Sequence, residues 1–145
     1  MPSRALAERT RREIIRLCHA GLDVRGLRAA VLQRLRTVMP IDAVFFATLD
    51  PATLLFTDAM VDDVLQESAP RFLDNEFLGD DVNRFVLIAR SQTPVRTLVQ
   101  ATGRHLERSP RYRDILAPLA PGDELRAVLR TGSAVLGLPV PAPRA

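Results

Sequence analysis

Residues 123–138 read Asp-Glu-Leu-Arg-Ala-Val-Leu-Arg-Thr-Gly-Ser-Ala-Val-Leu-Gly-Leu, and this stretch decides the fold. Its first half is apolar at every second position, which predicts a β-strand with one buried face and with Glu124 and Arg126 toward solvent. Residues 131–133 predict a turn, and the apolar run 134–138 predicts a returning strand in the middle of a sheet. The positions predicted to be buried are Leu125, Ala127 and Leu129.

The net charge of +3 conceals a segregated charge pattern. Residues 1–36 carry nine Arg and three acids, residues 42–81 carry ten acids and one Arg, and residues 82–145 carry ten Arg and four acids. The local charges are therefore +6, −9 and +6. Because a basic region alone is a weak indication of nucleic-acid binding, we interpret the pattern as surfaces that face each other within the fold or across a dimer.

The composition bounds the class of protein. Hydrophobic residues make up 47% of the 145 residues, which predicts one folded domain over residues 1–138 followed by a Pro/Ala-rich tail at 139–145. Cys18 is the only cysteine, so an internal disulfide is excluded, and we expect it to be a small core residue. The sequence contains neither an apolar run of the roughly 18 residues that span a bilayer nor a signal peptide, so we expect a cytoplasmic protein without membrane contact.

Two helices are predicted within residues 3–39, with Ser3 and Asp23 as their N-caps and Gly21 between them. A basic pair of helices raises the alternative that the chain is a DNA-binding protein that uses residues 3–39. The Arg residues, however, are spread over both helices and do not cluster at the start of the second, where a recognition helix reads base edges. We therefore expect no specific DNA binding by this chain.

Residues 41–61 predict an earlier hairpin, with its turn at Asp50-Pro51. Between the two hairpins, capping residues and apolar spacing predict helices, including a short helical piece at 95–101 and a helix start at Ser109-Pro110. Two hairpins with helices inserted between them predict an α+β fold on an antiparallel sheet. The apolar positions predicted to face inward from the first two of these helices are Phe72, Leu73, Phe77, Leu78, Val82, Phe85, Val86 and Ala89.

Several short blocks occur in the order and at the spacing of one protein family. They are Phe77, Asp81-Val82-Asn83-Arg84-Phe85, Ala89-Arg90-Ser91, Pro94-Val95-Arg96-Thr97-Leu98, Ala101-Thr102-Gly103, Arg108-Ser109-Pro110-Arg111-Tyr112-Arg113-Asp114 and Asp123-Glu124-Leu125-Arg126. Over residues 10–137 the chain resembles the N-terminal GAF-like sensor region of actinobacterial LuxR-type transcription regulators. The resemblance implies a five- or six-stranded antiparallel sheet with helices packed on its faces, and a small-molecule-sensing or dimerising regulatory role.

The chain departs from that family at its C-terminal end. Family members carry a large aromatic residue near Leu136, then more strand, a long helix and a LuxR-type helix-turn-helix. Here a Pro/Ala-rich tail follows, so we expect a GAF-like fold with a truncated C-terminal part, and the family's DNA binding is not carried over.

A GAF-like pocket would lie between the sheet and the acidic helices, open to an unknown small molecule. Each candidate also fits a plain structural role: the aromatic residues fit the core, and Asn83 fits a hydrogen bond to nearby backbone. For Arg126 we favour a structural ion pair with the Asp80/Asp81 region. The candidate ligand-binding residues are Phe56, Phe77, Asn83, Phe85, Tyr112 and Arg126.

Catalysis, metal binding and cofactors find little support in the sequence. His19 and His105 lie far apart without nearby ligand spacing, no phosphate-binding loop is present, and no Ser/His/Asp arrangement is readable. We therefore predict a non-enzymatic protein without a cofactor. We also expect a homodimer formed through the helix at 4–20, whose apolar stripe consists of Leu6, Ile14 and Leu17.

Overall fold

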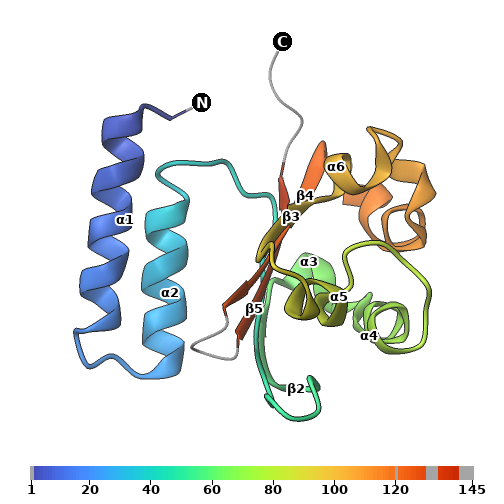
Figure 1. Ribbon diagram of the computed structural model, residues 1–145, viewed down its shortest axis with the longest axis horizontal. Helices are drawn as coiled ribbons and strands as arrows, with labels where there is room; N and C mark the ends of the chain where they lie inside the picture. The colour runs from blue at the N-terminus through green and yellow to red at the C-terminus, as the bar shows by residue number, and fades with distance from the viewer. Residues whose placement is uncertain (1, 120, 130–133, 141–145) are drawn as a thin grey trace. The chain divides into compact units, whose positions relative to one another are not determined.

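The computed structural model describes residues 2–119, 121–129 and 134–140 (Figure 1). Arg130, the turn predicted at 131–133 and the end of the tail, 141–145, lie outside the described residues. The chain divides into two compact units, Met1–Ile41 and Asp42–Ala145. The single domain predicted for residues 1–138 spans both units and stays a prediction.

The first unit is a pair of helices, α1 (Arg4–Cys18) and α2 (Val24–Leu35). The Ser3 hydroxyl accepts a hydrogen bond from the Leu6 N–H at 3.1 Å, and the Asp23 carboxylate accepts one from the Gly26 N–H at 2.7 Å. Both caps satisfy backbone donors that the first helical turn leaves without partners, as the sequence predicted. Gly21 has φ +73°, a left-handed conformation that costs glycine little.

Cys18 is exposed, and the prediction that it is a core residue is wrong. It is the last residue of α1, where the helix ends ahead of the turn at Gly21. The predicted stripe is half-buried, and Ile15, one residue beyond Ile14, is 43% exposed. Of the described helices in the whole chain, none is long and apolar enough to cross a membrane.

Among its described residues, the second unit has an antiparallel five-stranded sheet with helices (Figure 1). The order of the strands across the sheet is β2-β1-β5-β4-β3. Helices and a β-sheet are both present in this unit, which confirms the predicted α+β class. The resemblance implies five or six strands, and the described sheet has five. The elements are β1 (Phe45–Leu49), β2 (Phe56–Val61), α3 (Asp63–Gln66), α4 (Ala69–Phe77), α5 (Phe85–Arg90), β3 (Val95–Thr97), α6 (Leu98–Thr102), 3₁₀-helix η1 (Leu106–Arg108), π-helix η2 (Tyr112–Leu116), 3₁₀-helix η3 (Ala117–Leu119), β4 (Asp123–Leu129) and β5 (Ala134–Val140).

Strand β5 lies in the middle of the sheet, as its apolar run predicted. It pairs with β1 from Gly137 to Ala134 and with β4 along its whole length. It also continues two residues into the predicted tail, because Pro139 pairs with Glu124 of β4. Since β1 begins at Phe45, opposite Gly137, Pro139 has a partner strand on one side only, and a missing N–H is tolerated at such a position.

The core of the second unit lies between the sheet and α5. Phe85 and Ile88 of α5 are 2% and 1% exposed and pack with Phe45 of β1 and Val128 of β4. A Cβ atom at Gly137 would lie 3.5 Å from the edge of the Phe85 ring, so this ring rests close to the backbone of β5. The burial of Phe85 confirms the predicted inward stripe on this helix.

Strand β4 buries the opposite face from the one that the sequence predicted. Glu124, Arg126 and Val128 are buried, whereas Leu129 is 44% exposed, although Ala127 is buried as expected. The charged side chains face the helices because side chains of opposite charge meet them there, as described below. A period of two identifies a strand but does not say which face is covered.

Two further sequence predictions fail within the second unit. Leu73 and Phe77 of α4 and Leu78, which follows it, are 44%, 40% and 83% exposed, because the helix turns Glu76 inward beside the half-buried Phe72. Residues 95–97, predicted to be helical, form β3, because they pair with β4 at the edge of the sheet. The helix begins only at Leu98.

Candidate functional site

An apolar cavity of about 310 Å³ opens between the β1–β2 hairpin and helices α3 and α4. Its wall is almost entirely hydrocarbon, and Asp58 is the one ionisable side chain among the lining residues. A cavity of this size with mainly aromatic and aliphatic walls is typical of a binding site for a small apolar molecule. The lining residues are Phe45, Phe56, Thr57, Asp58, Ala59, Val61, Leu65, Ala69, Phe72, Leu73 and Ile115.

The wall of the cavity combines large apolar side chains with two alanines. Leu65, Ala69 and Phe72 follow one another at spacings of four and three, which places them on one face of the helical region. Ala59 on β2 and Ala69 on α4 leave the space that a longer side chain would fill. The aromatic wall is continuous, with ring centroids 4.7 Å apart for Phe45 and Phe72.

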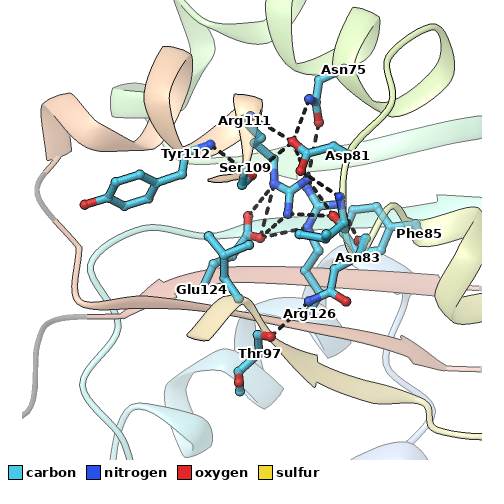
Figure 2. Close-up of polar contacts among 12 residues, drawn as sticks. Asn75, Asp81, Asn83, Phe85, Thr97, Ser109, Arg111, Tyr112, Glu124 and Arg126 are labelled. Atoms are coloured by element: carbon cyan, nitrogen blue, oxygen red, sulfur yellow. Dashed lines mark hydrogen bonds and ion pairs between the residues drawn. The ribbon is translucent and has the colours of Figure 1, made fainter. Parts of the chain in front are cut away.

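Near Phe72, which lines the cavity, lies a set of five buried charged residues, which we call the buried charge network. Figure 2 labels four of them, Asp81, Arg111, Glu124 and Arg126. Arg111, which precedes η2, donates from Nη2 to Oε1 of Glu124 at 2.8 Å, and its Nη1 lies 3.5 Å from Oδ2 of Asp81. The side chain of Arg111 is fully buried. Its two charged neighbours, Glu124 and Asp81, come from β4 and from the loop after α4, so the ion pairs connect parts of the chain that are distant in sequence. The members of the network are Glu76, Asp81, Arg111, Glu124 and Arg126.

Arg126 contacts Phe72, which lines the cavity. Its guanidinium donates to the carboxylate of Glu76 and to the carbonyl of Asn83, at 3.1 Å for the carbonyl, and its Nε lies 3.2 Å from Oε1 of Glu124. Its Cζ lies 4.1 Å from the centroid of the Phe85 ring and 5.5 Å from that of Phe72. Phe72 lines the cavity, so a single aromatic ring separates the cavity from the charges.

Asp81 joins three segments through one side chain. It accepts hydrogen bonds from the Asn75 amide at 2.9 Å, from the Ser109 hydroxyl at 3.0 Å and from the Arg111 N–H at 2.8 Å. It also accepts from the N–H of Val82 at 2.7 Å. A buried carboxylate with this many donors is satisfied, and it fixes the loop after α4 to the start of η2.

The network favours the ionised form of Asp81 and of Glu124. Burial alone raises the pKa of Asp81, but hydrogen bonds from Asn75, Arg111 and Ser109 and the charge of Arg111 outweigh it, and the pKa lies below its ordinary value. Burial likewise raises the pKa of Glu124, and the charges of Arg111 and Arg126 lower it further than burial raises it. For Arg126, burial lowers the pKa and the charges of Glu124 and Glu76 raise it, with a net increase.

The structure brings most of the predicted ligand-binding residues into one region but places only Phe56 on the cavity wall. Phe77 contacts Phe56, with ring centroids 5.2 Å apart, and is 40% exposed. Phe85 lies 6.1 Å from Phe56 on the network side. Tyr112 packs elsewhere, against a second apolar cluster around Leu98.

Asn83 and Arg126 adopt the structural roles that the sequence analysis favoured. The Asn83 amide donates to the carbonyl of Thr97 at 3.0 Å, a bond to backbone. Arg126 forms buried ion pairs, but the predicted partner is wrong: it pairs with Glu76 and Glu124. Asp81 pairs instead with Arg111.

Sequence reasoning missed Arg111 and Glu76. Each had a signal in the sequence. Glu76 follows Phe72 by four residues and so shares its helical face. Arg111 stands in the first turn after Ser109-Pro110, where the helix dipole disfavours a cation, and a cation at such a position indicates a specific acidic partner.

Among the described residues that line the cavity, none is a cysteine, serine or histidine. Within the described parts of the chain, no group of three His, Cys, Asp or Glu residues is placed to hold a metal ion. Comparisons with protein-family models, with curated proteins and with solved structures found no match to this chain.

Proposed function

We propose that the second unit is a non-catalytic, cytoplasmic regulatory domain of GAF-like type that binds a small, mainly apolar molecule in the cavity. The observation that carries this proposal is the cavity itself: about 310 Å³ of space with hydrocarbon walls in a unit of this size. Burial of apolar ligand surface is the driving force that such walls offer. The resemblance to sensor regions of LuxR-type regulators supports the same role.

The buried charge network supports a sensing role because it connects the cavity to distant segments. Phe72 contacts both the cavity and the guanidinium of Arg126. Through Glu124 and Arg111, that guanidinium is linked to Asp81 and the start of η2. A ligand that moves the Phe72 ring would therefore act on a network whose members tolerate little displacement.

Binding of neutral aromatic probes tests the proposal. Naphthalene or indole is added to the protein. Saturation-transfer NMR then reports which protons of the probe contact the protein. We expect both to bind, because a dry apolar cavity of about 150 Å³ already binds benzene in another protein. The Ala69→Leu variant fills part of the cavity and should weaken binding by about tenfold.

The matched control is Ala29→Leu, which makes the same change at an exposed position of α2. It should leave probe binding unchanged. Equal binding by the wild type and Ala69→Leu, or no transfer to either probe at its solubility limit, would contradict the proposal.

A further inference from the structure

Strand β2 is an outer strand of the described sheet, with β1 as its neighbour. An outer strand presents unpaired backbone groups along one side, and an added strand can pair with them. Residues 57–59 of β2 are exposed. The surface beside the cavity therefore includes a strand edge as well as apolar side chains.

The register of the β1–β2 pair identifies which residues face this edge. The N–H of Asp62 donates to the carbonyl of Val44 at 3.0 Å. Bonded pairs alternate in an antiparallel ladder, so Met60, two residues earlier, also bonds to β1. Ala59 and Val61 stand at the intervening positions. Their N–H and C=O groups point away from β1, and on that side the C=O of Val61 accepts a hydrogen bond from the Gln66 side chain at 3.3 Å.

Ala59 and Val61 also line the cavity, and the cavity reaches the edge of the strand. Residues 56–59 all contribute to the lining, although their side chains alternate between the two faces of the sheet. Consecutive residues can line one space only where the backbone edge itself forms the wall. A strand paired with Ala59 and Val61 would therefore direct every second side chain into the cavity.

The charge of the surroundings determines the class of partner. Of the acids in residues 42–81, Glu76 and Asp81 are buried and paired with Arg126 and Arg111, but exposed acids lie on α3 and α4 at Asp63 and Asp74 and on β2 at Asp58. A second copy paired through the same edge would bring a like-charged segment against this one, which is unfavourable. A basic strand has the complementary charge.

We propose that the β2 edge binds an extended peptide segment in which apolar residues alternate with Lys or Arg. The peptide adds a strand antiparallel to β2 and bonds to the N–H and C=O of Ala59 and to the N–H of Val61. Its apolar side chains enter the cavity, and its basic side chains lie on the face that Asp58 shares. The proposal goes beyond binding of a small molecule, and it predicts that a small molecule in the cavity competes with the peptide.

The probe is a fluorescein-labelled octapeptide of four Lys-Val repeats, and its binding to the full chain is measured by fluorescence anisotropy. The Val residues bond to β2 in the proposed register, so N-methylation of the Val amides should weaken binding by about tenfold or more. N-methylation of the Lys amides, which point away from β2, is the matched control and should leave affinity within about twofold. A Glu-Val octapeptide should bind at least about tenfold more weakly than the Lys-Val peptide.

A second readout is amide hydrogen exchange by NMR. In the free protein the N–H groups of Ala59 and Val61 should exchange quickly and that of Met60 slowly, and the Lys-Val peptide should protect the first two. The Ala59→Pro variant removes one edge donor at a position that tolerates proline and should weaken peptide binding by about tenfold.

Absence of Lys-Val binding below about 1 mM would overturn the proposal, as would equal effects of the two N-methylation patterns. The N-methylated peptides decide the question even if Ala59→Pro does not fold. Naphthalene binding is measured in the absence of the peptide. A protein that binds naphthalene but not the Lys-Val peptide would therefore contradict this proposal and leave the proposed function intact.

Discussion

The guanidinium of Arg126 lies on the face of the Phe85 ring, 4.1 Å from its centroid, and both side chains are at most 2% exposed. A cation on an aromatic face is attracted by the negative face of the ring, and this attraction strengthens away from water. The contact joins the buried charge network to the apolar core. Each of the two residues can be tested separately.

Arg126→Met should destabilise the protein by about 3–5 kcal/mol, because it leaves the carboxylates of Glu76 and Glu124 buried without this cation. Urea unfolding followed by circular dichroism measures the free energy of unfolding. Arg96→Met is the matched control, since Arg96 pairs with Arg126 across the β3–β4 ladder and is exposed. The control should change stability by no more than about 0.5 kcal/mol. Equal losses for the two variants would show that the buried ion pairs contribute little.

Phe85→Ala should lower the free energy of unfolding by about 3–5 kcal/mol through lost burial and a residual void. The ring contacts the core from α5 and lies next to the backbone of Gly137. Leu78→Ala removes a side chain that is 83% exposed and should cost less than about 0.5 kcal/mol. The two values come from the same urea titrations. A Phe85→Ala loss below about 1 kcal/mol is incompatible with the packing described here.

Stability should fall at acidic pH. The pKa values of Asp81 and Glu124 are lower in the folded protein than their ordinary values of 3.8 and 4.5. As pH falls through those ordinary values, the unfolded chain takes up protons first, so the stabilisation is complete above about pH 5 and is lost progressively below it. Urea unfolding at a series of pH values between about 3 and 7 measures the slope.

The Asp81→Asn variant should show a smaller loss between about pH 5 and 3 than the wild type, because one of the two carboxylates no longer titrates. Its exposed neighbour supplies the control, and Asp80→Asn should retain the wild-type slope. A wild-type stability that is constant over this range, or that increases toward low pH, would refute the assignment of lowered pKa values.

The homodimer through the helix at 4–20, with its stripe of Leu6, Ile14 and Leu17, stays a prediction; the stripe is half-buried, and Ile15 beside it is 43% exposed. Light scattering at micromolar concentrations should give a mass of twice 16.1 kDa. Ile15→Glu should give the mass of one chain, whereas Leu87→Glu, at a position of similar exposure on α5, should leave the mass unchanged. A single-chain mass for the wild type at every concentration would exclude the dimer.

The elements that sequence reasoning identified well are those with local signals. Ser3, Asp23 and Gly21 mark the ends of the first two helices through interactions within a few residues, and the structure has those interactions. The alternation in 123–129 identified a strand, and the apolar run after it identified the central strand. Local chemistry was sufficient in each case.

The failures come from interactions across long sequence separations. Glu124 and Arg126 are buried because Arg111 and Glu76 meet them, and those partners lie 13 and 50 residues away. Charged residues ordinarily face water, so the alternation alone favoured the wrong face. The cavity was placed in the correct region, between sheet and acidic helices, but its walls depend on how α4 is turned, which Glu76 determines.

The central position of β5 has a consequence for the order of events during synthesis. Phe45 of β1 pairs with Gly137 of β5, which is synthesised 92 residues later, so β1 lacks this partner strand during most of translation. Until β5 is synthesised, the β1–β2 hairpin and the β3–β4 pair are not joined, and the edges of β1 and β4 that pair with β5 are open. Long-range pairing of this kind slows folding and leaves strand edges open to other chains. The nascent protein should therefore need protection, for example by a chaperone, until β5 has left the exit tunnel.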